Sequence, residues 1–410
     1  MIAFHFPPCT GTSGVLRSLK FSRYLPESGW QPVLLTVHPR AYEETDMRSE
    51  KSIPEELRVV RAFALDVKRH LGLHGLFPDW LAIPDRWGSW LLGAVPSGLR
   101  AIRKYRVDVI FSTFPVCTAV LSGFLLHLLT GKPWVVDLRD SMTEGNYPPE
   151  KFRRRIWRWI EEKAMQHASR VIFTAASTRR MYLRRYPRLA PEKCLLISNG
   201  YDEEDFQSLT LSKAGPIPAD RPLQLLHTGM LYPEERDPKP FFRAISRLKC
   251  EGKISAANLR ISLRAPSSED FYRRILSEFQ IEDLIEILPS VLHHQALQEC
   301  ADADGLLLFQ AANCDHQIPA KAYEYLRSRK PIFALTSRTG DTAALLNEVG
   351  GATIVDLADE GDIYRVLPDY LNALRGGLHP LADSQKIMRY SRRSQAAQLA
   401  GYLSELKRES

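Results

Sequence analysis

The stretch Ile318–Leu335 reads IPAKAYEYLRSRKPIFAL and joins a helix signal to a strand signal. Pro319 suits the first turn of a helix. The apolar run Ile332–Leu335 has the length of a buried strand, and another such run, Gly305–Phe309, precedes the helix. Strand, helix and strand in this order are typical of a parallel sheet covered by helices.

The same alternation extends in both directions along the chain. It includes predicted helices at Val15–Pro26 and Arg153–Ala168 and a Pro/Gly/Asp-rich stretch at 199–222 with the composition of a linker. Because 410 residues are long for one core, we expect two domains. The predicted strands are Ile2–Phe6, Val33–Thr36, Val59–Arg61, Val109–Ser112, Trp134–Asp137, Val171–Phe173, Cys194–Ile197, Leu223–His227, Leu259–Leu263, Ile285–Leu288, Gly305–Phe309, Ile332–Leu335 and Thr353–Val355.

These patterns predict a first domain at 1–200, a linker at 201–222, a second domain at 223–385 and closing helices at 386–410 that return to the first domain.

Apolar residues make up 44% and charged residues 25% of the chain, which excludes a disordered or fibrous protein. The six cysteines lack the spacing of metal or redox motifs, so we expect free thiols in a reducing compartment. No targeting segment is visible, and the apolar window 114–130 is too short to span a bilayer, so a buried helix and a cytoplasmic protein are expected.

The charge of +7 is unevenly spread. Residues 1–200 hold 30 Lys+Arg against 18 Asp+Glu, a net of +12, and the remainder holds 25 against 30, a net of −5. All seven tryptophans lie in the first half. Two halves with such different compositions are expected to meet different partners.

Two stretches of the first half are candidates for chemistry. Gly11–Gly14 follows a predicted strand and opens a helix, where free N–H groups suit an anion or a sugar, although a plain turn explains the spacing as well. Asp137, Arg139 and Asp140 stand at the end of a predicted strand, the position where open α/β sheets bind ligands. The alternative is a salt bridge of Arg139 that shapes the loop.

Two stretches of the second half are further candidates. His227, Thr228 and Gly229 end a predicted strand, and Arg236 follows, so they form a plausible diphosphate site or, alternatively, another turn. Glu324 lies on the helix of Ile318–Leu335, where a ribose hydroxyl is a good partner for a carboxylate. The spacing by itself favours a surface pair of Glu324 with Lys321.

Residues 151–160, KFRRRIWRWI, combine a predicted apolar face of Phe152, Ile156, Trp159 and Ile160 with arginines on the other faces. This pattern suits an anionic membrane surface, or else a core helix with a solvated basic side. No HExxH, GxSxG, P-loop or paired-cysteine motif is present, and no metal site is expected. We find no nucleic-acid recognition motif and expect no nucleic-acid partner.

Together these stretches resemble bacterial glycosyltransferases of the GT-B fold, family 4 type. The resemblance covers most of the chain in the expected order and implies two facing Rossmann-like, doubly wound domains with a C-terminal helix crossing back to the first. Its elements are Gly11–Gly14 with Arg17, PWVVDLRDSM (133–142), ISNGYDEEDF (197–206), LLHTGMLYPEERDP (225–238) and, most specific, Ile318–Leu335.

The resemblance implies a role for each matching residue. Glu324 matches the glutamate that holds the donor ribose, Gly229 the glycine whose N–H approaches the distal phosphate, and Pro289 to Val291 the loop that frames the base. The donor-side set is completed by Gly14, Thr228, Arg236, Arg264 and Lys321. The acceptor-side set is Gly11, Arg17, Asp137 and Arg139, with Asp140 as a polar group facing the acceptor.

The chain departs from the family pattern in two places. His316 stands where the family has a second glutamate, and Met230 and Glu235 stand where its diphosphate loop has basic residues. We therefore expect Arg236, Arg264 and Lys321 to stabilise the leaving diphosphate, with Asp140 and His316 as the candidate catalytic residues.

The resemblance implies a retaining transferase that needs no cofactor or metal. It would move a sugar from a nucleotide diphosphate sugar to a glycan or lipid-linked acceptor for cell-surface polysaccharide or glycolipid synthesis, in the cytoplasm or on the inner face of the membrane. Two alternatives stay open: a GT-B-fold nucleotide-sugar epimerase and a non-catalytic scaffold at the membrane surface.

Overall fold

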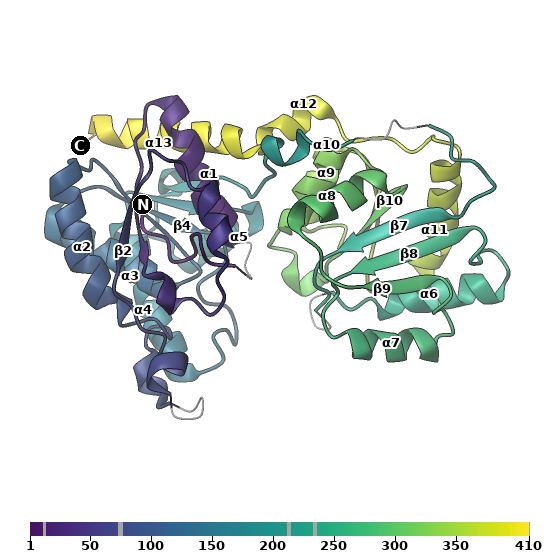
Figure 1. The fold of residues 1–410 in the computed structure, drawn as a ribbon, viewed down its shortest axis with the longest axis horizontal. Helices are drawn as coiled ribbons and strands as arrows, with labels where there is room; N and C mark the ends of the chain where they lie inside the picture. The colour runs from purple at the N-terminus through teal and green to yellow at the C-terminus, as the bar shows by residue number, and fades with distance from the viewer. Residues whose placement is uncertain (11–13, 73–76, 211–214, 233–235, 410) are drawn as a thin grey trace. The chain divides into compact units, whose positions relative to one another are not determined.

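The computed structural model describes residues 1–10, 14–72, 77–210, 215–232 and 236–409 and is shown in Figure 1. The chain divides into two compact units, which are described one at a time. Unit 1 comprises Met1–Ser198 with Arg392–Ser410, and unit 2 comprises Asn199–Ser391. Gly11, a predicted acceptor-side residue, lies outside the described residues.

The sheet of unit 1 is entirely parallel. One part pairs β1 with β2 and the other has the order β3-β4-β5-β6. Ile2 joins the two parts, because it forms bridges with Leu35 of β1 and Ser112 of β3. The strands are β1 Val33–Val37, β2 Arg58–Ala62, β3 Ile110–Thr113, β4 Trp134–Leu138, β5 Arg170–Phe173 and β6 Cys194–Leu196.

The predicted strand Ile2–Phe6 is wrong beyond its first residue. The Phe4 carbonyl accepts hydrogen bonds from the hydroxyls of Tyr42 and Thr36 at 2.8 and 3.1 Å instead of joining a ladder. Pro7 and Pro8 follow, and neither has an N–H to continue the pairing. The other predicted strands of this half are present, with ends shifted by one residue at most.

Six α-helices of unit 1 pack against its sheet. The predicted buried helix at 114–130 is α3, and most of its first ten residues have no access to solvent. No helix among the described residues is long and apolar enough to cross a membrane. The helices are α1 Gly14–Tyr24, α2 Trp90–Tyr105, α3 Cys117–Thr130, α4 Lys151–His167, α5 Ala176–Arg185 and α13 Arg392–Glu409.

Helix α4 contacts the core through a face that the sequence pattern did not identify correctly. Trp157 and Ile160 are buried, whereas Phe152 and Trp159, two members of the predicted apolar face, are exposed. Trp157 also donates its Nε1–H to the Pro84 carbonyl at 2.5 Å. The helix is thus a core helix that keeps two aromatic side chains at the surface.

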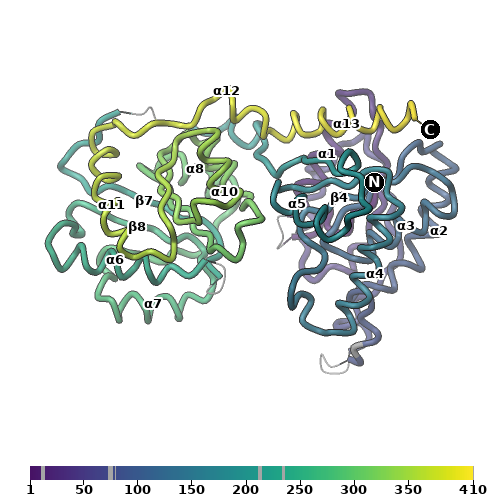
Figure 2. The backbone as a smooth tube through the Cα atoms, turned by 180° about the vertical axis from the view of Figure 1, so that it is seen from behind, coloured from purple at the N-terminus to yellow at the C-terminus, as the bar shows by residue number. Residues whose placement is uncertain are grey.

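The C-terminal helix α13 belongs to unit 1 and packs against α1; Figure 2 shows it from behind. Ala396, Leu399 and Leu403 are buried together with Phe21 of α1. Trp30 donates a hydrogen bond to Ser404 at 3.0 Å. Residues from opposite ends of the chain therefore complete one core.

Unit 2 contains a second parallel sheet, with the order β12-β11-β10-β7-β8-β9. The order reverses between β7 and β10, which makes the carboxyl ends of these strands a topological switch point. All six predicted strands of this half are present. They are β7 Leu223–Thr228, β8 Leu259–Arg264, β9 Ile285–Leu288, β10 Gly305–Phe309, β11 Ile332–Leu335 and β12 Ala352–Val355.

Helices alternate with these strands along the chain, so each strand except the last is followed by a crossover helix. Helices α6 and α11 pack against each other, and α8 contacts α9. The helices are α6 Lys239–Cys250, α7 Glu269–Glu278, α8 His293–Asp302, α9 Ala320–Ser328, α10 Asp341–Val349, α11 Glu360–Arg375 and α12 Ser384–Ile387.

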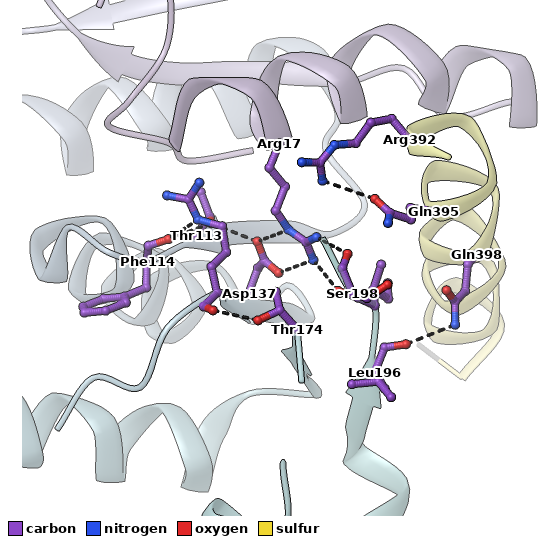
Figure 3. A network of polar contacts seen from close by, with 12 residues as sticks. Arg17, Thr113, Phe114, Asp137, Thr174, Leu196, Ser198, Arg392, Gln395 and Gln398 are labelled. Atoms are coloured by element: carbon purple, nitrogen blue, oxygen red, sulfur yellow. Dashed lines mark hydrogen bonds and ion pairs between the residues drawn. The ribbon is translucent and has the colours of Figure 1, made fainter. Parts of the chain in front are cut away.

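A buried ion pair ties the elements of unit 1 together (Figure 3). Arg17 of α1 donates to both carboxylate oxygens of Asp137, at 3.0 and 2.8 Å, and their side chains are 2% and 1% exposed. The remaining guanidinium contacts go to the carbonyls of Ile197 and Ser198 at 2.9 and 2.8 Å. Thr113 of β3 donates to Asp137 at 2.9 Å, so the pair links α1, β3, β4 and the segment after β6.

We expect Arg17→Met to destabilise unit 1 by about 3–5 kcal/mol, because Asp137 would keep a buried charge without its partner. Denaturant unfolding followed by tryptophan fluorescence reports on unit 1, since all seven tryptophans lie in it. Arg48→Met is the control, because the Arg48–Asp46 pair is at the surface. Equal unfolding midpoints of the two variants would show that the buried pair has no special role.

Candidate active site

His227, near the end of β7, is buried, and Lys321 of α9 lies beside it. His227 Nδ1 lies 2.8 Å from the Leu307 carbonyl, and its Nε2 lies 3.3 Å from Nζ of Lys321. A carbonyl only accepts, so Nδ1 carries the proton and Nε2 accepts from Lys321. Burial holds the pKa of His227 well below its usual range, so the ring is neutral.

Lys321 lies in the first turn of α9 and also donates to the Thr228 carbonyl. Burial, reinforced by the charge of Arg236, lowers the pKa of Lys321 to about 7, while Glu324 opposes the shift. A bound anion would raise the pKa of this amine, so the amine would gain a proton near pH 7. This is the behaviour expected of a group that meets a phosphate.

Arg236 lies close enough to Lys321 and His227 to lower the pKa of both groups. Its Nη1 donates to the Met230 carbonyl at 2.8 Å, and its guanidinium lies 5.3 Å from the ring centre of Tyr232. Two of the three predicted donor-side cations, Arg236 and Lys321, are therefore near each other in unit 2. Glu235, a position where the family has a basic residue, lies outside the described residues.

Gly229 adopts a left-handed backbone conformation, with φ of +86°. A Cβ at this position would lie 3.2 Å from Nζ of Lys321, so the glycine leaves room for the amine. Its N–H donates to the Arg264 carbonyl at 2.8 Å. The expectation that this N–H faces a phosphate does not match the structure, because a strand-end hydrogen bond already uses it.

Thr228 is held by Tyr325, a residue that the sequence analysis did not select. The Thr228 N–H donates to the Tyr325 hydroxyl at 2.9 Å, and the two hydroxyls lie 3.1 Å apart. Tyr325 is buried in α9, and it fixes the helix against the strand end. The threonine therefore positions this junction.

Arg264, the third predicted phosphate-binding cation, is paired with a carboxylate, that of Glu299. Its Nε and Nη2 donate to the two carboxylate oxygens of Glu299 at 2.8 and 2.5 Å, and its Nη1 donates to the Pro289 carbonyl at 2.8 Å. A bidentate pair of this kind is strong and directional. Arg264 thereby anchors the loop of Pro289 and Val291, the predicted base-framing loop, to β8 and α8.

Glu324 forms a pair with His293, which is the first residue of α8. Glu324 Oε1 lies 3.0 Å from His293 Nε2, and the two side chains are 23% and 47% exposed. The carboxylate is thus accessible and already directed at a hydrogen-bonding group. The sequence analysis did not select His293, since nothing in the pattern connects α8 with α9.

His316 lies in the loop before α9, with its Nε2 3.5 Å from the Gln317 side-chain nitrogen. The preceding residue, Asp315, has a buried carboxylate oxygen, Oδ1, that lacks a hydrogen-bond partner among the described residues. Such an oxygen is costly unless a ligand satisfies it. Asp315 is a second residue that the sequence pattern did not single out.

The acceptor-side residues of unit 1 divide into buried and accessible ones. Arg17 and Asp137 are sealed in their ion pair, which contradicts a direct role in acceptor binding. Arg139 donates to the carbonyls of Phe114 at 2.7 Å and Gly14 at 2.8 Å, and so anchors the start of α1. Asp140 is exposed at the carboxyl end of β4 and remains the accessible carboxylate of the set.

His5 adds a further group near this edge. It is partly buried, and burial together with the charge of Arg139 lowers its pKa to about 4. The ring is therefore neutral near pH 7 and can act as a hydrogen-bond donor or acceptor. Among the described side chains, no group of three or more His, Cys, Asp or Glu is arranged to hold a metal ion.

Comparisons with known proteins bear on the class of domain and on the fold. Residues 15–200 match the model of the glycosyl transferase 4-like domain. The whole fold is similar to sucrose-phosphate synthase from Thermosynechococcus elongatus, with a TM-score of 0.66 and 15% identity over 100% of this chain and 98% of that chain. A search by sequence among curated proteins finds no match.

Two further structures share the fold. HepE from Anabaena, in complex with UDP and glucose, has a TM-score of 0.62 and 14% identity over 98% of this chain and 99% of that chain. WaaG, a glycosyltransferase involved in lipopolysaccharide biosynthesis, has a TM-score of 0.63 and 14% identity over 98% of this chain and 100% of that chain. The fold and the domain match together indicate a glycosyltransferase of GT-B architecture. The domain match covers residues 15–200, which form most of unit 1.

We expect Lys321 to take up a proton when a nucleotide diphosphate sugar binds above about pH 7. The free amine has a pKa of about 7, and a diphosphate favours its charged form. Affinity should therefore fall as pH rises from 7 to 8.5, approaching about tenfold per pH unit. Calorimetric titration in buffers of different ionisation enthalpy measures the uptake directly.

Lys321→Arg is the matched variant, because arginine keeps its charge across this range. This variant should bind the nucleotide diphosphate sugar with an affinity that is independent of pH between 6 and 8.5. Arg236→Gln should shift the onset of proton uptake to higher pH, since Arg236 lowers the pKa of Lys321. A wild-type affinity that is flat across this range would refute the assignment of Lys321 to the diphosphate.

Proposed function

We propose that the chain is a retaining glycosyltransferase that moves a sugar from a nucleotide diphosphate sugar to a hydroxyl of a glycan or lipid-linked acceptor. The observation that carries this proposal is the junction of β7 and α9, where Lys321 and Glu324 stand one helical turn apart beside Arg236. Cations for a diphosphate and a carboxylate for a ribose are thereby gathered at the switch point of the sheet.

Each part of the donor has a candidate partner in unit 2. Lys321 and Arg236 would neutralise the diphosphate, and the ribose hydroxyls would replace His293 as partners of Glu324. The loop of Pro289 to Val291, held by Arg264, would frame the base through backbone groups. Asp315 and His316 precede α9 and are candidates to bind the sugar hydroxyls.

In the proposed reaction the bond between the anomeric carbon and the diphosphate oxygen breaks. The acceptor hydroxyl forms the new glycosidic bond on the same face, which retains the configuration, and its proton passes to the departing diphosphate oxygen. Charge builds up on the diphosphate as the bond breaks, and prepositioned cations lower the barrier by stabilising it there. Protonated Lys321 and Arg236 supply these charges, so no metal or cofactor is required by the scheme.

Several features support an acceptor in cell-surface polysaccharide or glycolipid synthesis. Unit 1 carries the basic, tryptophan-rich half of the sequence, and α4 exposes Phe152 and Trp159 among its arginines. These features favour a site at an anionic membrane surface, on its cytoplasmic side. One fold neighbour acts in lipopolysaccharide biosynthesis and another binds UDP-glucose, which makes UDP-glucose the first donor to test.

Glu324→Ala should weaken UDP-glucose binding by about 10- to 100-fold, because hydrogen bonds to a charged group contribute about 1.5–3 kcal/mol. Donor-induced stabilisation in a thermal-unfolding series measures this loss. Glu278→Ala on α7 of the same unit is the control, since it removes an exposed carboxylate elsewhere. Equal stabilisation of the two variants by the donor would argue against Glu324 as the ribose ligand.

Nuclear magnetic resonance with UDP-glucose and a set of alkyl and glycan acceptors tests the reaction class. A product with the donor's anomeric configuration is expected, and an inverted product contradicts retention. Incubation with the donor alone should give at most slow hydrolysis. An isomerised nucleotide sugar would identify an epimerase, and donor binding without any turnover would point to a scaffold.

A further inference from the structure

A cavity of about 340 Å³ lies within unit 1, apart from the buried ion pair. It is formed by the helical turn Val67–Leu71, the segment from Phe77 to Trp87, the start of the β3–α3 connection and the beginning of α4. We name it the aromatic pocket, after its walls of Phe77, Trp87, Tyr147 and Trp157. It adjoins the carboxyl end of β3, the edge at which α/β sheets bind ligands.

The walls of the aromatic pocket are held in place by the core. Trp157 stands edge-on to Phe114, with ring centres 5.6 Å apart, and to Tyr147 at 5.9 Å. Trp87 packs against Phe4 at 4.4 Å and donates its Nε1–H to the Ala41 carbonyl at 3.2 Å. A rigid aromatic lining of this kind suits the apolar part of a ligand at low entropic cost.

Three cations line the same pocket: Lys68, Arg86 and Arg153. Arg86 is held by Asp66 and Glu43 and lies 5.0 Å from the ring centre of Trp87. Arg153 contacts Glu150 at 3.2 Å through Nη1, and its Nε is buried without a hydrogen-bond partner among the described residues. An acceptor atom supplied by a ligand would satisfy this nitrogen.

Asp85 is the carboxylate among the described residues that line the pocket, and it is hydrogen-bonded to the start of α3. Asp85 accepts from the N–H and hydroxyl of Thr118 at 2.7 and 2.9 Å and from the N–H of Trp87 at 3.0 Å. It therefore caps the beginning of α3 and presents little negative charge to the pocket. Arg86 and Arg153 are paired with carboxylates outside the lining, so the groups that the pocket offers to an anion are the Lys68 amine and the Nε–H of Arg153.

Exposed apolar side chains stand on the elements that form the pocket. Leu71, Trp80 and Phe152 are 50%, 68% and 62% exposed. Soluble proteins seldom present several large apolar side chains on neighbouring elements without a use for them. In Figure 1 these elements form the end of unit 1 near the beginning of α4.

We propose that the aromatic pocket binds the anionic group of an amphipathic acceptor, with the apolar part of the acceptor packed on the aromatic walls. The proposal rests on the proposed transferase function and names its acceptor class: a saccharide attached to an apolar chain through a phosphate or another anionic group. Arg153 and Lys68 bind the anion, and Tyr147 and Trp87 contact the apolar segment. A cavity of about 340 Å³ holds a phosphate with a short length of chain.

Dodecyl phosphate below its critical micelle concentration is the probe, titrated calorimetrically into the full chain. Arg153→Gln and Lys68→Gln should each weaken binding about tenfold, and Tyr147→Ala should weaken it by several-fold. Arg158→Gln removes the same charge from an exposed position on α4 and should bind like the wild type. Thermal unfolding of each variant establishes that it is folded.

The comparison ligands identify what the pocket recognises. Dodecyl maltoside, which has the same chain without charge, and inorganic phosphate, which has no chain, should both bind at least tenfold more weakly. Tighter binding of dodecyl phosphate than of laurate assigns a phosphate, and the reverse assigns a carboxylate. Equal loss with Arg158→Gln, or equal binding of dodecyl maltoside, would overturn the proposal in favour of general surface attraction.

This experiment is independent of the donor site. A chain that binds UDP-glucose through Glu324 but shows no preference for dodecyl phosphate refutes the aromatic pocket alone. A chain that binds dodecyl phosphate normally but whose UDP-glucose binding is unaffected by Glu324→Ala refutes the proposed donor site alone.

Discussion

The buried pair of Arg17 and Asp137 is the constraint on which unit 1 depends. A charge sealed from water is tolerated only with a partner and with its remaining hydrogen bonds filled, and here Thr113 and two carbonyls after β6 fill them. The pair holds α1 against the carboxyl ends of β3 and β4. It therefore sets the edge on which Arg139 and Asp140 stand, although it takes no part in binding itself.

The cations of unit 2 differ from the buried pair of unit 1, because a cation that binds a ligand must not already be neutralised by a carboxylate. Among the described residues, Lys321 donates to a neutral ring and a carbonyl and forms no direct ion pair with a carboxylate. Arg236 lies nearby and lowers the pKa of that amine. Arg264, in contrast, is neutralised by Glu299 and anchors a loop. This difference in pairing separates the groups that we propose bind a diphosphate from the group that anchors a loop.

The sequence pattern predicted most of the strands and the donor helix, because buried parallel strands are short apolar runs and Pro319 marks a helix start. It failed where a residue's role depends on a distant partner. Phe4 leaves the ladder because Tyr42 and Thr36 bind its carbonyl. Arg264 and Arg236 look alike as basic residues near strand ends, and only the position of Glu299 distinguishes them. His293 and Asp315 carried no local signal.

The amino-acid order by itself determined the alternation of strands and helices and the charge difference between the halves, because these depend on local periodicity and composition. It also carried the family resemblance that made Glu324 the candidate ribose ligand. The tertiary structure alone decided which of the candidate groups are paired, buried or accessible. Hydrogen-bond partners and desolvation come from residues 80 to 120 positions away, as for His227 with Leu307 and Arg17 with Asp137. Contacts between such distant residues produce no periodic pattern in the sequence. Their effect on the charge and pKa of a side chain can therefore be assigned only from the folded structure.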